Sequence, residues 1–301
     1  MAENASLTER GAHQALASAC VHVGLDPEGA ELIRIGSNAV FQLRTEPVIV
    51  RIRPDFDDAM DSARRQVAVA RWLEAEAYPA TRALHVEQPI ATDGRVVTFW
   101  ESASERGEYA PLAQVGALIR RLHELKAPAS LHLTDKRPIE ELDHRLEVLK
   151  GDLDESDAAF LGDCVDDLRS RYRSLNFVLA PGVIHGDANV GNVIFDRNGN
   201  VLLIDLDSFA IGPREWDLVQ TALFYERFGW HTEEEYRQFV EVYGWGIMSW
   251  PGYPVLADYR EVAMTLWLAR KAGTDERAAA EVRKRVAAIR TGGDRRDWAP
   301  F

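Results

Sequence analysis

A predicted β-hairpin in the second half of the chain constrains the fold more than any other segment. Apolar residues at 193–195 and 201–204 flank an Asn-Gly pair, which is the strongest short-range signal for a tight turn between two strands. Asn192 precedes the first strand and Asp205 follows the second. Because both positions fall at the open end of the hairpin, we expect the amide and the carboxylate to lie close together.

A second pattern leads into this hairpin. His185, Asp187 and Asn192 follow the spacing His-x-Asp-x-x-x-x-Asn of kinase catalytic loops, with Gly where protein kinases carry Arg. In phosphoryl transfer one Asp takes the proton of the acceptor hydroxyl, while an Asn and a second Asp hold Mg²⁺ on the nucleotide phosphates. A lone Asp in a loop is usually a turn former, but here residue types, spacing and hairpin agree. For His185 we expect hydrogen bonds that hold the loop backbone.

These motifs resemble the aminoglycoside phosphotransferase family, which includes choline-kinase-like and homoserine-kinase-like relatives. The resemblance is specific over residues 183–219, where His-Gly-Asp-x-x-x-x-Asn is followed by Ile-Asp and then by Gly-Pro-Arg-Glu-Trp-Asp-Leu. It implies that Asp187 is the catalytic base and that Asn192 and Asp205 are the Mg²⁺ ligands. It also implies that Asp217 is a buried residue that supports the catalytic loop.

Extended to the whole chain, the resemblance implies an α+β fold of two lobes, similar to that of protein kinases. Residues 1–102 are expected to form a nucleotide-binding lobe with a small antiparallel sheet. Residues 103–301 are expected to form a mainly helical lobe with the catalytic loop and the substrate pocket. The implied enzyme is a small-molecule kinase that needs Mg²⁺ and moves the γ-phosphate of ATP or GTP to a hydroxyl group. Its acceptor would be an aminoglycoside-like or other cationic compound.

A short turn near the amino terminus is a candidate phosphate-binding segment. Gly36, Ser37 and Asn38 lie between two strand-like runs, where backbone N–H groups can face phosphate oxygens. An ordinary hairpin turn would have the same sequence, so the resemblance carries this assignment. A later strand-like run covers residues 95–100, and Glu101 follows it at the position where kinases bind the nucleotide base through backbone groups of the hinge. Trp100 could flank the base or lie in the core.

The strand 48–53 alternates apolar residues with Ile49, Arg51 and Arg53. Arg51 stands where kinases carry the Lys that reaches the α- and β-phosphates, and Arg53 is the second candidate. An exposed arginine of the sheet is the alternative interpretation. Arg keeps its charge and can pair with phosphate through two N–H groups, but its geometry differs from that of Lys.

Two positions depart from the family pattern. Gln66, on a predicted helix from 59 to 77, stands where a Glu normally holds the Lys, and an amide cannot neutralise Arg51. Asp207 stands where a Gly is common. It could touch a second metal ion or the substrate, or it could be a solvated turn residue.

Apolar residues spaced by three and four predict helices in the remainder of the chain. We expect stripes at 112–125, 139–149 and 161–175, with Ser156 as the N-cap of the third, a helix opened by Asp217, and helices near 233–242, 258–272 and 274–289. Tryptophans at 230, 245 and 250 lie near three consecutive glutamates and could bind an amine. A helix start beside core tryptophans is the alternative.

The net charge of −13 argues against nucleic acid as a partner and is compatible with a cationic substrate. The chain contains no apolar run of 18 residues and begins without a signal-peptide pattern, so we expect a cytoplasmic protein with no membrane association. Cys20 and Cys164 are expected to be free thiols. The oligomeric state and the choice between ATP and GTP stay open.

Two other functions fit parts of the pattern. The absence of the usual Lys and Glu is compatible with a non-catalytic nucleotide-binding regulatory protein, although the Asp, Asn and Asp set argues against it. A protein kinase fits less well, because the segment from 205 to 217 is too short for a peptide-binding activation loop.

Overall fold

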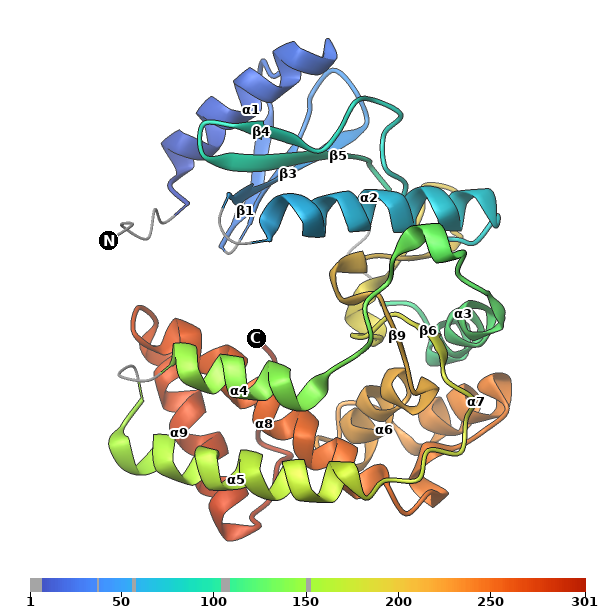
Figure 1. Ribbon diagram of the computed structural model, residues 1–301, viewed down its shortest axis with the longest axis vertical. Helices are drawn as coiled ribbons and strands as arrows, with labels where there is room; N and C mark the ends of the chain where they lie inside the picture. The colour runs from blue at the N-terminus through green and yellow to red at the C-terminus, as the bar shows by residue number, and fades with distance from the viewer. Residues whose placement is uncertain (1–6, 37, 56–57, 104–108, 150–152) are drawn as a thin grey trace. The chain divides into compact units, whose positions relative to one another are not determined.

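The computed structural model describes residues 7–36, 38–55, 58–103, 109–149 and 153–301 (Figure 1). Two compact units share the chain, and neither is continuous in sequence. The first unit combines residues up to Ala110 with Ala127–Leu133 and Gly191–Phe209. The second unit contains the remaining segments. The architecture is the expected α+β fold with a small antiparallel sheet and many helices.

The first unit contains a five-stranded antiparallel sheet in the order β1-β2-β3-β5-β4. Its strands are β1 (Glu31–Ile35), β2 (Ala39–Gln42), β3 (Val48–Pro54), β4 (Ile90–Thr92) and β5 (Arg95–Glu101). Strand β3 alternates as predicted, because Val48, Val50 and Ile52 are at most 2% exposed while the residues between them are half-buried. The alternation leaves Arg51 on the opposite face from the core.

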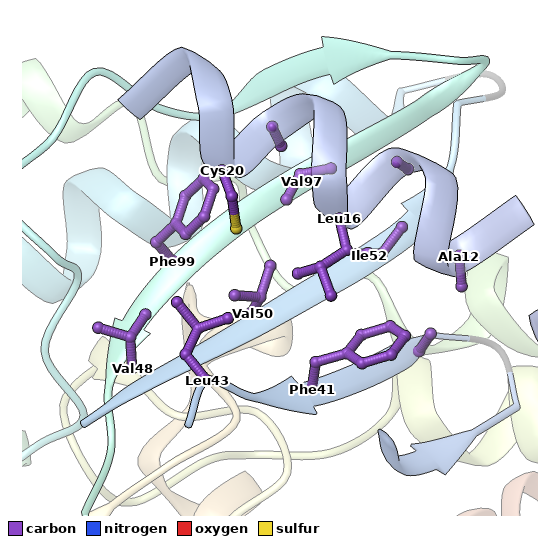
Figure 2. Close-up of a cluster of buried hydrophobic side chains, with 13 residues drawn as sticks. Ala12, Leu16, Cys20, Phe41, Leu43, Val48, Val50, Ile52, Val97 and Phe99 are labelled. Carbon is purple, nitrogen blue, oxygen red and sulfur yellow. The ribbon is translucent and has the colours of Figure 1, made fainter. Parts of the chain in front are cut away.

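Helix α1 (Glu9–Val23) covers the apolar face of this sheet, as Figure 2 shows. Ala12, Leu16 and Cys20 point from α1 toward Phe41 of β2 and the apolar residues of β3 and β5. Thr8 caps the helix by accepting from the N–H of Gly11. Burial raises the pKa of the Cys20 thiol to about 11, so this free cysteine is an inert core residue.

Helix α2 (Ala59–Ala75) packs on the other face of the sheet. Its residues Ala59 and Ala63 form a small apolar cluster with Val96 of β5, whereas the next residue, Val97, belongs to the cluster under α1. Because neighbouring side chains of a strand point to opposite faces, the two helices must cover opposite sides of β5. Each face of the sheet is thereby partly buried.

The predicted hairpin is confirmed within the first unit. Strands β7 (Val193–Phe195) and β8 (Val201–Leu203) pair antiparallel, with Val193 opposite Leu203. The Asp196 carboxylate accepts from the side-chain amide of Asn200 and from the N–H groups of Asn200 and Asn198, and these hydrogen bonds lower its pKa. Gly199 adopts φ +84°, which explains the Asn-Gly signal. Leu203 also hydrogen-bonds with the segment 79–81, which fixes the hairpin to the body of this unit.

The second unit is mainly helical. It contains α3 (Leu112–Glu124), α4 (Pro138–Val148), α5 (Glu155–Arg173), α6 (Val219–Glu226), α7 (Glu233–Tyr243), α8 (Tyr253–Ala272) and α9 (Glu276–Thr291). A two-stranded sheet joins β6 (Gly182–Ile184) to β9 (Ala210–Gly212). Helix α8 has buried residues on several sides and contacts α4, α5, α6 and α9, so it forms the centre of this unit. No helix in the described part of the chain is long and apolar enough to cross a membrane.

Several predicted element boundaries were wrong. Asp154, not Ser156, caps α5, and it does so by accepting from the N–H of Ser156. Helix α8 begins at Tyr253, five residues earlier than expected, with a proline in its first turn where no N–H is needed. Asp217 ends the 3₁₀ turn Arg214–Asp217, and α6 begins only at Val219.

The three consecutive glutamates at 233–235 form the first turn of α7. Thr232 and Glu235 make a reciprocal capping box, in which each side chain accepts from the backbone N–H of the other residue. Trp250 is buried, and its Nε1 donates to the Asn176 carbonyl. These contacts correspond to the helix-start interpretation of the acidic and aromatic residues.

Candidate active site

The loop around Asp187 follows β6 directly. Gly186 adopts φ +84°, a conformation that side-chain-bearing residues rarely tolerate, and this accounts for glycine between His185 and Asp187. His185 is fully buried, and its Nδ1 accepts from the N–H of Asp187 at 3.3 Å. His185 therefore holds the loop backbone, as the sequence predicted. The side chain of Asp187 is 44% exposed, so a buried backbone presents an accessible carboxylate.

The carboxylate of Asp217 binds the backbone of this loop. One carboxylate oxygen accepts from the N–H of His185 at 2.7 Å and the other from the N–H of Gly186 at 2.8 Å. His123 of α3 adds a contact from its Nε2 at 3.1 Å, and its Nδ1 lies 2.9 Å from the hydroxyl of Tyr243. All of these groups except the tyrosine hydroxyl are buried, and Asp217 has no exposed surface.

The ionisation of Asp217 follows from these contacts. Complete burial would by itself raise the pKa of this carboxyl group. Hydrogen bonds from His123 and from the backbone of His185 outweigh the burial, so the pKa is lowered. Asp217 is therefore a buried anion at neutral pH, stabilised by donors that belong to the loop around Asp187 and to α3.

The carbonyl of Gly186 is held as firmly as its N–H. Nε1 of Trp216 donates to this carbonyl at 2.8 Å, and Nη2 of Arg260 on α8 donates to it at 3.1 Å. Nη1 of Arg260 also lies 3.3 Å from Oδ1 of Asp187. Arg260 was not predicted from the sequence, although the charged pair Arg260-Glu261 within a largely apolar helical segment was a visible signal.

The second candidate group is the pair Asn192 and Asp205. The hairpin brings them together, because the N–H of Ile204 donates to the carbonyl of Asn192 at 2.9 Å, one residue before Asp205. Asp205 adopts φ +62°, and its side chain is 42% exposed at the end of β8. Asp187 belongs to the second unit, whereas Asn192 and Asp205 belong to the first.

The donor set at the hairpin suits Mg²⁺. This ion takes few protein ligands, prefers oxygen and completes its shell with waters and phosphates. One amide and one exposed carboxylate provide such donors, and the described residues contain no group of three or more His, Cys, Asp or Glu that could enclose a metal ion without substrate. Asn192 and Asp205 therefore fit a metal that arrives with a nucleotide.

Arg51 points into a cluster of carboxylates. Its Nη1 lies 3.4 Å from Oδ1 of Asp207, and its Nη2 lies 3.5 Å from Oδ1 of Asp205. Arg53 also contacts Asp207, with Nη2 at 3.2 Å from Oδ2. Asp207 therefore pairs with both arginines, a contact that the sequence did not predict.

Gln66 has a different role from the Glu it replaces. Its side chain is buried and donates to the hydroxyl of Ser62 at 3.4 Å, and the same hydroxyl accepts from Nη1 of Arg53 at 3.1 Å. The negative charge that kinases place on the helix is supplied here by Asp207, two residues after Asp205.

The remaining nucleotide-binding candidates are only partly described. Gly36 donates its N–H to the carbonyl of Asn38 at 3.0 Å, which closes the β1–β2 turn, while Ser37 lies outside the described residues. Glu101 is the last residue of β5, one residue beyond the expected end of the strand, and its N–H donates to the carbonyl of Arg82 at 2.9 Å. Trp100 is buried, with Nε1 bound to the hydroxyl of Thr98, which corresponds to the core interpretation.

The sequence matches the model of the phosphotransferase enzyme family over residues 31–259. The chain belongs to that family. The match includes Asp187, Asn192, Asp205 and Asp217. No curated protein matches the chain significantly by sequence.

Solved structures show the same fold at low sequence identity. An amicoumacin kinase in complex with AMP-PNP, Ca²⁺ and Ami is 15% identical, with a TM-score of 0.73 over 97% of this chain and 96% of that one. A spectinomycin phosphotransferase in complex with ADP and spectinomycin is 16% identical, with a TM-score of 0.65 over 91% and 93%. A choline/ethanolamine kinase family protein from Mesorhizobium loti is 18% identical, with a TM-score of 0.60 over 93% and 94%. The expected kinase-like fold is thereby confirmed.

Proposed function

We propose that this protein is a Mg²⁺-dependent kinase that transfers the γ-phosphate of ATP or GTP to a hydroxyl group of a small molecule. The observation that carries the proposal is the accessible carboxylate of Asp187 on a loop whose backbone is bound by Asp217, Trp216 and Arg260. Family membership supports phosphotransferase chemistry in general.

The reaction is a single displacement at phosphorus. The acceptor hydroxyl hydrogen-bonds to Asp187 and gives its proton to this carboxylate. Its oxygen forms a bond to the γ-phosphorus, while the bond from that phosphorus to the β–γ bridging oxygen breaks. The products are a phosphate monoester and a nucleoside diphosphate. Positioning of the reactants and neutralisation of charge provide most of the rate enhancement in such reactions.

Asn192 and Asp205 would hold Mg²⁺, which neutralises charge on the β- and γ-phosphates when it is bound. Arg51 would contribute a guanidinium to the phosphates, with Asp207 as its counter-ion. The turn at Gly36, Ser37 and Asn38 would cover the phosphates, and the end of β5 at Glu101 would lie near the base. Because the N–H of Glu101 is already bonded to Arg82, the base would have to use another hinge group.

We place the acceptor among small hydroxyl compounds, with aminoglycoside-like or other cationic molecules first. The net charge of −13 favours a cationic ligand over nucleic acid. The structural neighbours include proteins crystallised with spectinomycin and with Ami, which makes these compounds reasonable first probes. A cytoplasmic location would supply the nucleotide and keep both cysteines reduced.

The test is an acceptor screen in the presence of Mg²⁺ and either ATP or GTP. Purified protein is incubated with amino sugars, aminocyclitols and amino alcohols, and products are detected as a mass increase of one phosphate. We expect one class of acceptor to be phosphorylated only with Mg²⁺ present. Nucleotide binding by calorimetry without transfer to any acceptor, and without nucleotide hydrolysis, would favour the alternative of a non-catalytic nucleotide-binding regulatory protein.

A further inference from the structure

Arg260 is a buried charge at an unusual position. It lies on α8, the central helix of its unit, and is only 8% exposed. Its guanidinium carbon stacks over the ring of Trp216 at 4.6 Å, and Nζ of Lys136 lies 5.0 Å from the same ring. Burial lowers the pKa of Lys136, and Arg260 adds to this effect by repulsion. Two cations beside one buried ring repel each other, so the presence of Arg260 at this position has to be explained by the contacts that its guanidinium makes.

The contacts of Arg260 explain why a guanidinium stands there. Nη1 contacts Oδ1 of Asp187 at 3.3 Å, and Nη2 donates to the carbonyl of Gly186 at 3.1 Å and lies 3.5 Å from that of Trp216. Nε is buried without a hydrogen-bond partner among the described residues. The hydrogen-bonding capacity of the side chain is therefore directed at the catalytic loop.

We infer that Arg260 is the positioning residue of the catalytic base, an assignment that rests on the function proposed above. Nη1 of its guanidinium holds one carboxylate oxygen of Asp187, and Nη2 holds the loop backbone at the carbonyl of Gly186. The base therefore meets the acceptor hydroxyl in one orientation. A planar fork can fix both groups at once, which a single ammonium cannot do. The loop lacks the Arg that protein kinases carry beside this Asp, and a guanidinium reaches it from α8 instead.

The geometry predicts a specific kinetic result. Arg260→Ala should lower kcat by about 100-fold, because misplacement of a reacting group by about 1 Å has that effect. The KM for MgATP should change less than about twofold, since in this assignment Arg260 serves the acceptor side of the reaction. Arg260→Lys should fall between the wild type and Arg260→Ala, because it keeps the charge without the fork.

Chemical rescue separates positioning from a purely structural role. Guanidinium at low millimolar concentration, far below denaturing levels, should restore part of the turnover of Arg260→Ala by entering the space above Trp216. Methylammonium at the same concentration should restore less, because it lacks the planar pair of donors.

Arg285→Ala is the matched control. Arg285 is also buried, stacks over Trp298 at 4.9 Å and binds Glu281, but it lies on α9 and has no contact with the loop among those of the described residues. Its removal should lower Tm as much as Arg260→Ala does, with kcat unchanged. If Arg260→Ala does not fold, Arg260→Met, which keeps an apolar side chain beside Trp216, replaces it in the kcat, KM and Tm measurements and in the crystal structure, but not in the rescue assay.

The outcomes are distinct. A fall in kcat that guanidinium partly restores supports the inference. A wild-type kcat in Arg260→Ala overturns it. The inference is also overturned if Arg260→Ala and Arg285→Ala lose the same kcat for the same fall in Tm and guanidinium restores neither. If the wild type neither phosphorylates an acceptor nor hydrolyses MgATP, the proposed function fails. Crystal structures then decide the inference separately, because a carboxylate of Asp187 that keeps its orientation in Arg260→Met overturns it and one that rotates away supports it.

Discussion

The two groups of candidate residues, one around Asp187 in the second unit and one around Arg51 in the first, are held in different ways. Around Asp187, three hydrogen bonds between loop backbone groups and buried side chains measure 2.7 to 2.8 Å, two more measure 3.1 and 3.3 Å, and the central anion, Asp217, has no exposed surface. Around Arg51, side chains of partly exposed residues meet at 3.2 to 3.5 Å. Short buried hydrogen bonds resist rearrangement, whereas long ion pairs near water contribute little and exchange partners easily.

This difference matches the functions proposed for the two groups, proton transfer for Asp187 and phosphate binding for Arg51. A base that must meet one hydroxyl oxygen needs a fixed loop. When a triphosphate binds, the arginines must either break their ion pairs with the carboxylates or contact phosphate oxygens in addition to them. We therefore expect the loop around Asp187 to be organised before substrate binds, and the side chains around Arg51 to rearrange when phosphate binds.

The largest effect is expected at Asp217. Asp217→Ala removes the acceptor of two loop N–H groups and leaves them and His123 buried without that partner, so it should destabilise the protein by about 3–5 kcal/mol. Urea unfolding followed by circular dichroism measures this change. Asp154→Ala, which removes only an exposed helix cap, should cost about 1 kcal/mol. Equal losses in the two variants would contradict the claim of a rigid loop.

The next effect concerns the metal ligands. Asp205→Ala should reduce turnover by roughly 100- to 1,000-fold, the range found when one group that stabilises transition-state charge is removed. Raising the Mg²⁺ concentration should recover part of this loss, because Asn192 remains. Since Asp205 is 42% exposed, the unfolding midpoint should be nearly unchanged. A variant with full activity at the original Mg²⁺ concentration would remove Asp205 from the site.

A smaller effect is expected on the pH dependence of stability, because the contribution of Asp217 decreases as the pH falls. The pKa of Asp217 is lower in the folded state than its ordinary value of 3.8, so ionised Asp217 stabilises the fold above that pH. This contribution is lost as the pH falls through the lowered folded-state pKa. The difference in Tm between the wild type and Asp217→Asn should therefore be constant near neutrality and shrink only below about pH 4. A difference that disappears already near pH 6 would show that Asp217 is not the ionised anchor.

The smallest effect is expected on the phosphate side. Asp207→Asn should change stability by less than about 1 kcal/mol, because its ion pairs with Arg51 and Arg53 are partly exposed. It should act mainly on the KM for MgATP, since Arg51 loses its counter-ion. A double-mutant cycle with Arg53→Gln measures the coupling free energy between Asp207 and Arg53. A coupling of several kcal/mol would contradict the view that the side chains around Arg51 are loosely held.

The parts of the site that local sequence encodes were predictable. The Asn-Gly turn, the two apolar runs and the residues that flank them lie within about fifteen positions, and the paired strands follow from these signals. The alternation in β3 likewise placed Arg51 on the face opposite the core, because period two is a local property.

The remaining features depend on contacts between residues distant in the chain. Arg260 reaches Asp187 across 73 positions and Asp207 reaches Arg51 across 156, and neither spacing leaves a periodic signal. The cap of α5 was misassigned because Asp154 and Ser156 are both good capping residues, and the choice depends on where the preceding chain turns. The early start of α8 depends on packing of the whole unit around it.

The central claim is that Asp187 is the base of a phosphoryl transfer. The most direct measurement compares the wild type with Asp187→Asn for MgATP binding by calorimetry, for Tm, and for phosphorylation of the acceptor found by the screen. The account predicts unchanged nucleotide affinity, a Tm close to that of the wild type, and turnover reduced by at least about 100-fold. Full turnover in Asp187→Asn with the same acceptor would contradict it.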